Sequence, residues 1–264
     1  MPSGTPEGGI LRVQSVSVRF GGLAALSDVS ISVPPGSVTG IIGPNGAGKT
    51  TLFNAVCGFV RPHEGTIQLG DRSLAGVRPH QLAGLGIART IQGVRLFPRL
   101  TALENVMVGG DHRHRPGFLS ALLGLPRSDG AERAARTEAL ASLEELGVAD
   151  VAGRRAADLP YGVQKRVALA RALAAQPSLL LLDEPAGGLG ADDVAQLGQL
   201  IRGLRDRMSV VLVEHRMDLV MSACDQVTVL DAGDVIASGT PAEMQADARV
   251  LEAYLGAEVT DAGG

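Results

Sequence analysis

The feature that most constrains this chain is a glycine-rich segment, residues 43–51, that lies between a short apolar run and a helical pattern. Its spacing is a glycine, four further residues and then Gly-Lys-Thr, which is typical of a phosphate-binding loop between a buried strand and a helix. Glycines allow successive backbone N–H groups to point at phosphate oxygens, and the N-terminus of the helix adds positive potential. The sequence therefore predicts a site for nucleotide phosphates in an α/β protein.

Two side chains of this loop carry the expected chemistry. Lys49 is expected to reach the β- and γ-phosphates, and the Thr50 hydroxyl is expected to ligate Mg²⁺. The chain has only two lysines, Lys49 and Lys165, so one of them stands where a compact ammonium among phosphates is needed. The residues that we expect to contact the nucleotide here are Gly43, Pro44, Asn45, Gly46, Ala47, Gly48, Lys49, Thr50 and Thr51.

A pair of carboxylates follows a second apolar run, residues 179–182, which is best read as a buried parallel strand. Ligands of α/β sheets bind at the carboxyl ends of such strands. We expect Asp183 to hold Mg²⁺ directly or through water, and Glu184 to act as the general base that polarises an attacking water. His215 follows another apolar run, residues 210–213, so it could reach the γ-phosphate at the same edge of the sheet.

The spacing of apolar residues changes along the chain and divides it into an expected core and an insertion. Residues 11–33 alternate as β-strands do, the middle of the chain has helical spacing, and strands and helices alternate after residue 179. The tetrapeptide Asp-Ala-Gly-Asp at residues 231–234 signals a hairpin. We expect a flexible tail over residues 1–9, a nucleotide-binding α/β core over 10–92 and 176–259, and a helical subdomain over 93–175.

The composition excludes several classes of protein. The chain has 264 residues, 45% of them hydrophobic, which is enough for a substantial buried core and excludes wholesale disorder. Its formal net charge of −4 disfavours a nucleic-acid partner, because nucleic-acid binders carry a basic surface. No apolar run approaches the roughly 18–20 residues of a membrane helix. Cys57 and Cys224 form no CxxC pair and are expected to be buried, reduced thiols.

The order of these motifs resembles that of the ATP-binding subunits of ABC transporters, over about residues 10–256. The matching motifs are the phosphate loop, the Q-loop residue Gln92, the signature at residues 159–164, Asp183-Glu184-Pro185, the D-loop at residues 187–190 and the switch histidine His215. Within that family the chain is most similar to the branched-chain amino acid uptake ATPases. The segments that carry this second resemblance are residues 20–23, 43–54, 95–106, 159–162, 214–217 and 253–256.

The resemblance implies a P-loop NTPase core of the ABC ATPase type, with an N-terminal antiparallel β region and an inserted helical subdomain that carries the signature. It also implies that Phe20 stacks on adenine. Gln92, which taken alone is a solvated loop residue, would ligate Mg²⁺ and assist catalysis together with His215. Tyr161 and Gly162 of the signature would contact ATP that is held by an opposite subunit.

Three residues depart from the pattern of the family. Pro160 stands where a serine is general, and it supplies neither a hydroxyl nor an N–H. One hydrogen bond to a charged group, worth roughly 1.5–3 kcal/mol, is therefore missing. Val163 is unusual in the signature, and Gly190 ends the D-loop where Asp or Asn is expected. These changes bear on the coupling between subunits and not on the fold.

The function that the resemblance implies is hydrolysis of ATP, with Mg²⁺, to power uptake of branched-chain or related hydrophobic amino acids. The chain would bind membrane permease subunits at the cytoplasmic face and pair with a second ATP-binding subunit, an identical copy or a paralogue. A solute-binding protein would be an indirect partner. Alternatives are a soluble ABC-type ATPase not coupled to transport and a transporter ATPase for another small solute such as urea or amides. An unrelated P-loop kinase or GTPase is a further alternative, although no guanine-reading NKxD motif is present.

Overall fold

The computed structural model of this chain describes residues 11–90, 92–114 and 127–261, so the expected tail over residues 1–9 lies outside the described residues. Two compact units make up the chain. The first, which we call the core unit, consists of Met1–Leu82, Ser178–Ala186 and Gly190–Gly264. The second, which we call the helical unit, consists of Ala83–Pro177 and Gly187–Leu189. The helical unit thus begins before the expected residue 93 and includes part of the D-loop.

An antiparallel sheet with the strand order β2-β1-β4-β5 forms one layer of the core unit. Its strands are β1 (Leu11–Phe20), β2 (Leu23–Val33), β4 (Glu64–Leu69) and β5 (Arg72–Ser73). β1 and β2 pair up to Phe20 opposite Leu23, so the alternation seen in the sequence belongs to one long hairpin. Ser15, with a φ of 49°, lies where the register of β1 shifts, as in a β-bulge.

A second sheet of the core unit contains, in this order, β10-β9-β3-β8-β7. These strands are β3 (Val38–Ile42), β7 (Leu179–Asp183), β8 (Ser209–Val213), β9 (Gln226–Asp231) and β10 (Asp234–Gly239). β3, β7 and β8 are parallel and buried throughout, as in strands that are covered on both faces. β9 and β10 form an antiparallel hairpin that turns at Ala232 and Gly233, both with positive φ, which confirms the hairpin signal.

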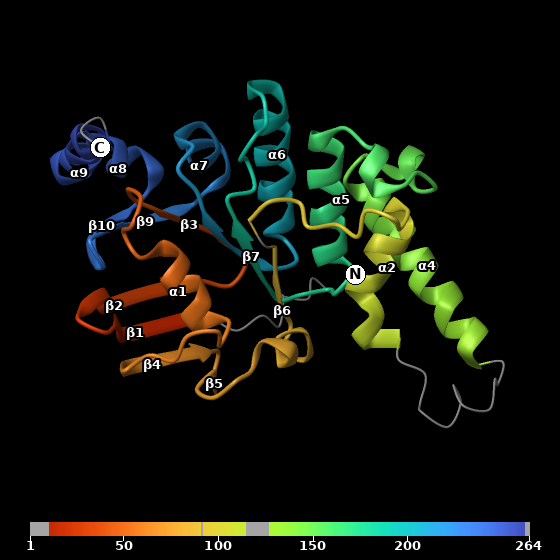
Figure 1. Cartoon of the computed structure of the whole chain (residues 1–264), viewed down its shortest axis with the longest axis horizontal. Coiled ribbons are helices and arrows are strands. Elements are labelled where there is room, and N and C mark those ends of the chain that lie inside the picture. Colours follow the sequence, from red (N-terminus) through yellow and green to blue (C-terminus); the bar gives the residue numbers. More distant parts are fainter. Residues whose placement is uncertain (1–10, 91, 115–126, 262–264) are drawn as a thin grey trace. The chain divides into compact units, whose positions relative to one another are not determined.

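Helices cover both faces of this second sheet. They are α1 (Lys49–Val56), α6 (Ala191–Leu204), α7 (Met217–Ala223), α8 (Pro241–Ala246) and α9 (Ala248–Asp261), with a 3-10 turn at Pro79–Gln81. Figure 1 shows α1 on the side of the antiparallel sheet and α6 to α9 on the opposite side. α6 buries Val194, Leu197, Ile201 and Leu204, which confirms the amphipathic helix that their spacing predicts.

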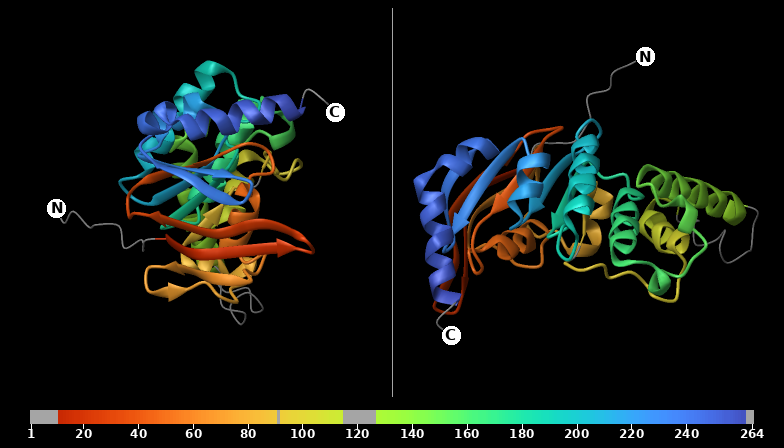
Figure 2. Two further views of the ribbon diagram at one scale, coloured as in Figure 1. Left: turned by 90° about the vertical axis from the view of Figure 1, so that its left-hand side faces the viewer. Right: turned by 90° about the horizontal axis from the view of Figure 1, so that it is seen from above.

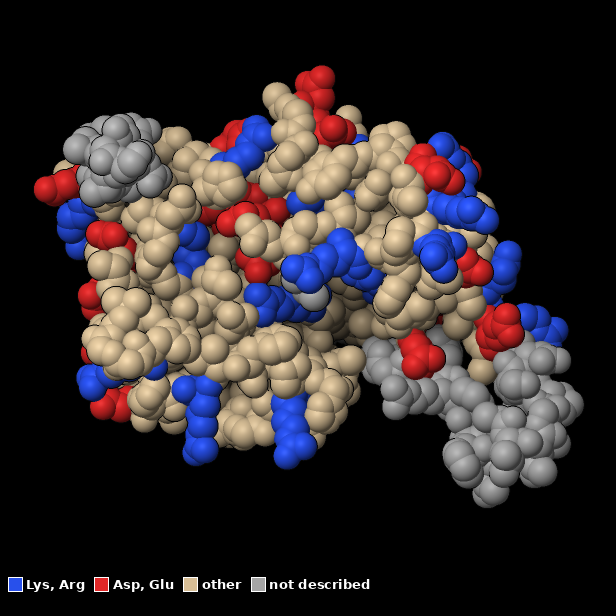
Figure 3. Space-filling model, in the orientation of Figure 1, with Lys and Arg blue, Asp and Glu red and all other residues tan. Residues whose placement is uncertain are grey.

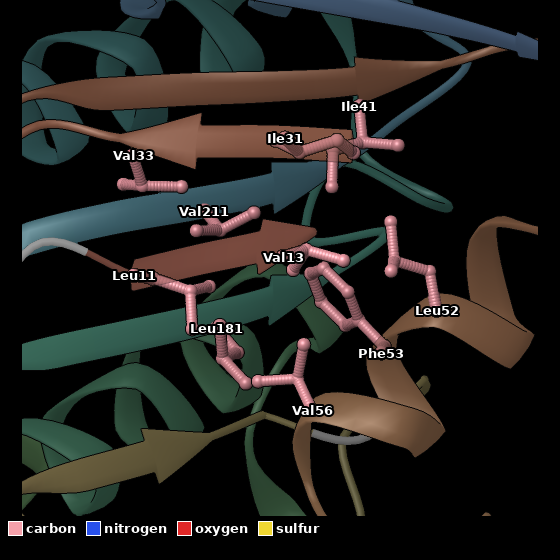
Figure 4. A pocket seen from close by; sticks show the side chains of 10 residues that line it. All are labelled: Leu11, Val13, Ile31, Val33, Ile41, Leu52, Phe53, Val56, Leu181 and Val211. Carbon is pink, nitrogen blue, oxygen red and sulfur yellow. The ribbon is translucent and has the colours of Figure 1, made fainter. Parts of the chain in front are cut away.

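The space between α1 and the two sheets is the apolar core of this unit (Figure 4). A small cavity remains there, lined by Leu11, Val13, Ile31, Val33, Ile41, Leu52, Phe53, Val56, Leu181 and Val211. Leu181 of β7 and Val211 of β8 are register partners and face Phe53 of α1 across this space. Packing of α1 against both sheets fixes the position of the loop that precedes it.

In the described residues of the helical unit, the helices α2, α4 and α5 pack against one another (Figure 2). Its elements are β6 (Ile87–Arg89), α2 (Ala102–His114), α4 (Arg127–Glu145) and α5 (Tyr161–Leu173), with 3-10 turns at Ala83–Leu85, Ala149–Val151 and Ala156–Asp158. The N–H of Glu104 donates to Thr101 Oγ1, and the N–H of Thr101 donates to the Glu104 carboxylate, so a capping box begins α2. A Cβ at Gly109 would lie 1.9 Å from the carbonyl oxygen of Arg171, so only glycine allows α2 to approach α5 this closely.

The described residues show neither a membrane-spanning helix nor, on the face that Figure 3 shows, a separation of acidic from basic side chains. No helix within them is long and apolar enough to cross a membrane. Acidic and basic side chains are interspersed on the face that Figure 3 shows. Cys57 and Cys224 are buried and form no disulfide, as expected. Burial raises the pKa of Cys224 to about 12, so this thiol stays protonated.

Candidate nucleotide-binding site

The phosphate loop, residues 43–51, connects β3 to α1 and is enclosed by backbone on two sides. Gly43 has a φ of 147°, and a Cβ there would lie 2.0 Å from the carbonyl oxygen of Leu230. Gly48 has a φ of 101°, and a Cβ there would lie 2.6 Å from the carbonyl oxygen of Ala25. No residue with a side chain fits either position without moving the backbone. Close packing therefore requires these two glycines of the motif.

The N-terminus of α1 presents backbone donors. Gly48 is the N-cap residue and forms no side-chain capping bond. The first four N–H groups of an α-helix have no acceptor within the helix. The first turn of α1 carries no acidic residue that would compete for these donors. The amides and the helix dipole together form a site that favours an anion such as a phosphate.

Lys49 is oriented by the loop itself. Its Nζ donates hydrogen bonds of 2.7 Å to the carbonyl oxygens of Gly43 and Pro44, and the residue is only 8% exposed. Burial lowers the pKa of Lys49, and the negative charge of Glu184 acts in the opposite direction. An ammonium has three N–H donors, so the third is available to a phosphate oxygen. The two loop carbonyls thereby fix the position of the ammonium.

Two carboxylates lie at the carboxyl end of β7. Asp183 is the last residue of the strand, buried and opposite Val213 of β8. The N–H of Glu184 donates to the carbonyl oxygen of Val213 at 2.9 Å, and Glu184 has a φ of 46°. This left-handed conformation is uncommon outside glycine and clusters at functional sites. Because the charge of Glu184 acts on Lys49, the structure brings this carboxylate and the phosphate loop together.

Sequence reasoning misses a third carboxylate, Glu214, which lies directly after β8. It is fully buried and accepts hydrogen bonds from the N–H groups of Ala186 at 2.8 Å, His215 at 2.9 Å and Arg216 at 3.1 Å. It therefore ties the loop after β7 to the loop after β8. The signal that could have found it is an acidic residue that directly follows a fully apolar strand, because a buried carboxylate there needs amide donors.

His215 and Phe20 lie in the core unit with exposed side chains. The His215 imidazole is 55% exposed, and its Nδ1 lies 3.6 Å from Glu214 Oε2. β8 is adjacent and parallel to β7, so His215 and Glu184 follow strands that end at the same edge of the sheet. Phe20 is 52% exposed, and Leu23, its partner across the hairpin, is 69% exposed. An apolar surface is therefore open to a ligand at this hairpin.

Gln92, Tyr161 and Gly162 belong to the helical unit. Gln92 is exposed and follows β6. Tyr161 begins α5, Gly162 comes next, and the Nζ of Lys165 lies 5.5 Å from the centroid of the Tyr161 ring, within the range of a cation–π contact. Pro160 is the N-cap residue of α5 and makes no side-chain capping bond, as expected for a residue without a hydroxyl.

The candidate Mg²⁺ ligands are Thr50 and Asp183 in the core unit and Gln92 in the helical unit. In the described residues there is no cluster of three or more His, Cys, Asp or Glu that could hold a metal ion. Mg²⁺ is usually bound by one or two carboxylates together with waters and substrate phosphates. One buried carboxylate beside a phosphate loop fits a Mg²⁺ site that is completed by waters and phosphates. It is too few ligands for a site built from protein groups alone.

The comparison with protein families decides the class of this protein. The family profile described as "ABC transporter" matches residues 26–187, more than half of the chain, including the phosphate loop and Asp183-Glu184. This chain belongs to the ABC transporter family. A second profile, described as "Branched-chain amino acid ATP-binding cassette transporter", matches residues 235–260 of this ABC protein, from β10 into α9.

Curated relatives match this ABC protein over almost its whole length. It is 41% identical over 249 residues to LivG of Escherichia coli K12, covering 94% of this chain and 98% of LivG. It is 42% identical over 250 residues to BraF of Pseudomonas aeruginosa, with the same coverage. Both are described as high-affinity branched-chain amino acid transport ATP-binding proteins. LptB of Haemophilus influenzae, a lipopolysaccharide export system ATP-binding protein, is 33% identical over 248 residues, covering 94% of this chain and 97% of LptB.

Solved structures agree with this assignment. The ADP conformation of an ATP-binding cassette of an ABC transporter has a TM-score of 0.81 at 31% identity, covering 94% of this chain and 99% of that one. A dimeric post-hydrolysis ATP-binding cassette bound to ADP and Pi has a TM-score of 0.74 at 26% identity, covering 88% and 98%. The expected family, fold class and ATPase activity are confirmed, and the unrelated kinase or GTPase is excluded. The roles of the individual site residues stay predictions.

Proposed function

We propose that this ABC ATPase powers the uptake of branched-chain or related hydrophobic amino acids through a membrane permease. The observation that carries the proposal is the similarity to LivG and BraF over 94% of the chain, with the C-terminal profile at residues 235–260 in support. Both relatives are described as transport proteins for branched-chain amino acids. LptB, at lower identity, serves lipopolysaccharide export, so the shared cassette does not by itself select the cargo.

Catalysis at this site is positioning and charge stabilisation. Lys49 and the amides of the phosphate loop bind the β- and γ-phosphates of ATP, and Phe20 stacks on adenine. Glu184 accepts a proton from the water that attacks the γ-phosphorus, while the bond from that phosphorus to the ADP oxygen breaks and inorganic phosphate leaves. His215 and Gln92 contact the γ-phosphate and orient the water. The orientation of Lys49 by two loop carbonyls supports this arrangement.

Three residues are candidate Mg²⁺ ligands in this proposal. Asp183 supplies a buried carboxylate at the end of β7, Thr50 a hydroxyl in the first turn of α1, and Gln92 an amide oxygen. Bound there, Mg²⁺ neutralises charge on the phosphates of the nucleotide.

Each ATP site is completed by a second ATP-binding subunit, an identical copy or a paralogue. Tyr161 and Gly162 at the start of α5 contact the ATP that the opposite subunit holds. Support comes from the related dimeric cassette bound to ADP and Pi. The helical unit is the subdomain that carries the signature. Together with Gln92, it transmits the closing motion of the dimer to permease subunits at the cytoplasmic face of the membrane. A solute-binding protein delivers the cargo and contacts the permease.

Uptake by cells tests this function. A strain that lacks the chromosomal copy receives either the wild-type chain or Glu184→Gln, and uptake of radiolabelled leucine, isoleucine, valine and urea is measured. We expect the wild type to restore uptake of the three amino acids and Glu184→Gln to leave it at background, because the variant binds ATP without turning it over. Urea uptake is expected to be equal in both strains.

The alternatives give different results in the same assay. Restoration of urea or amide uptake alone would identify a transporter ATPase for another small solute. Equal uptake of every solute in both strains, together with recovery of the chain free of membrane partners, would identify a soluble ABC-type ATPase and contradict the proposal.

A further inference from the structure

A side chain of α9 contacts the phosphate loop. Gly43, the first residue of the loop, donates its N–H to the hydroxyl oxygen of Tyr254 in α9 at 3.0 Å, although 211 positions separate the two residues in the sequence. We propose that Tyr254 is a positioning residue that holds the phosphate loop in its binding conformation and thereby sets the affinity for ATP. The inference rests on the proposed role of the loop in binding phosphates.

The contact belongs to a chain of hydrogen bonds that ends at the lysine. Gly43 donates its N–H to Tyr254, and the carbonyl oxygen of Gly43 accepts a hydrogen bond from Lys49 Nζ at 2.7 Å. Gly43 is therefore held from α9 on one side and by the lysine on the other. A shift of Gly43 moves the carbonyl oxygen that accepts a hydrogen bond from Lys49 Nζ. The hydroxyl of Tyr254 therefore affects the position of the lysine that binds phosphate.

Backbone groups of the β9–β10 hairpin also contact the loop. The N–H of Gly233, in the β9–β10 turn, donates to the carbonyl oxygen of Ala47 at 3.2 Å, and the carbonyl of Gly233 accepts from the N–H of Ser27 at 2.9 Å. Leu230 lies so close to Gly43 that a Cβ on this glycine would be 2.0 Å from its carbonyl oxygen. These backbone contacts do not depend on side-chain identity, whereas the contact of Gly43 with α9 depends on one hydroxyl.

The chemistry of Tyr254 suits an acceptor that does not titrate. Burial raises the pKa of Tyr254, with the Gly43 N–H acting weakly in the opposite direction. The phenol therefore remains neutral at physiological pH, and a neutral hydroxyl accepts a hydrogen bond while it keeps its own proton. Removal of the hydroxyl leaves the ring in place and deprives the Gly43 N–H of this acceptor.

Tyr254→Phe in the full chain tests the inference. We expect the Kd for ATP, measured by displacement of a fluorescent ATP analogue, to rise about threefold to tenfold, the range that one net hydrogen bond supplies. KM is expected to rise with Kd, while kcat at saturating ATP stays within about twofold of wild type, because the hydroxyl does not touch the reacting atoms. Amide exchange at Gly43, followed by NMR, is expected to accelerate. Leu251→Ala, an exposed change on the same helix, is the matched control and leaves all these quantities unchanged.

The outcomes separate this inference from the proposed function. Unchanged Kd in Tyr254→Phe overturns the inference, whether or not the melting temperature falls, because a merely structural contact would affect stability alone. Faster exchange at Gly43 with unchanged Kd overturns it as well, since the loop would then move without effect on binding. Lys49→Ala is measured alongside: if it weakens ATP binding while Tyr254→Phe does not, only the inference fails. If neither variant weakens binding, the phosphate-binding role fails and the inference fails with it.

Discussion

The carboxyl ends of β7 and β8 carry glutamates in opposite situations. Glu214, after β8, is fully buried and accepts hydrogen bonds from three backbone N–H groups. Glu184, after β7, is partly exposed, has a left-handed backbone and acts electrostatically on Lys49. The strands themselves are equivalent, since they are parallel neighbours that are buried throughout. Residue type at a strand end therefore does not decide between structure and chemistry; the burial and the backbone conformation of the glutamate differ between the two positions.

The hydrogen-bonding capacity of a carboxylate explains the difference. Two oxygens offer about four lone-pair sites. Glu214 uses three of them on amides of the two loops, so it cannot turn toward a ligand without leaving the buried N–H of Ala186 and two part-buried N–H groups unsatisfied. Glu184 keeps a partly exposed side chain at the edge where ligands of α/β sheets bind. This difference agrees with the proposed role of Glu184 as the general base, whereas Glu214 joins two loops.

The largest expected effect is on turnover in Glu184→Gln. Loss of a general base costs about 10²–10⁴-fold in rate, so steady-state phosphate release should fall by that factor. The melting temperature should stay close to that of wild type, because a side chain at this edge contributes little to packing. Phosphate release and thermal unfolding of the same preparation check both statements. A normal rate of release would remove Glu184 from the role of base.

Glu214→Ala should show the opposite profile. One buried and two part-buried N–H groups lose their acceptor. An unsatisfied buried group costs about 1–3 kcal/mol, so the free energy of unfolding should fall by at least about that amount. Glu214→Gln keeps one carbonyl acceptor and should lose less. Urea denaturation of the two variants and wild type measures the differences. Equal stability of all three proteins would contradict the structural role of Glu214 and thus the distinction between the two glutamates.

Leu181→Ala tests how much the buried part of β7, away from the two glutamates, contributes to stability. Leu181 is fully buried in β7 opposite Val211 of β8, and both side chains line the cavity under α1. Truncation of a buried leucine costs about 2–5 kcal/mol, and an existing cavity favours the upper part of that range because neighbours do not fill the space. Leu251→Ala on the surface of α9 is the control and should change stability by less than about 0.5 kcal/mol.

The smallest expected effect concerns pH and two capping boxes, that of Thr101 and Glu104 at the start of α2 and that of Thr240 and Glu243 at the start of α8. Hydrogen bonds from the backbone and the hydroxyl of Thr101 lower the pKa of Glu104, and those of Thr240 lower the pKa of Glu243. The folded protein therefore binds fewer protons at these carboxylates, so their stabilisation is present above the ordinary glutamate pKa and is lost as pH falls below it. Between about pH 5 and about pH 3.5, the melting temperature of the double variant Glu104→Gln, Glu243→Gln should fall by less than that of wild type. A larger loss in the variant would contradict the sign.

Local patterns predict the parts of this molecule that depend on neighbours in sequence. Residues 43–51, Asp183, Glu184 and the β9–β10 hairpin could be identified because their spacing is itself the signal. The contacts of Glu214 and Tyr254 could not, since they join loops and helices that only the tertiary fold brings together. The sequence pattern places the start of the helical subdomain at residue 93, whereas the compact unit begins at Ala83, because compactness is a property of packing and not of periodicity.

The central claim is that ATP is held between two subunits and that Glu184 performs the chemistry. Size-exclusion chromatography with light scattering of Glu184→Gln, incubated with ATP and Mg²⁺, tests it most directly. We predict a dimer that retains unhydrolysed ATP, whereas Glu214→Gln under the same conditions turns ATP over and accumulates no such species. A monomer of Glu184→Gln that converts ATP to ADP at the wild-type rate would contradict both halves of the claim.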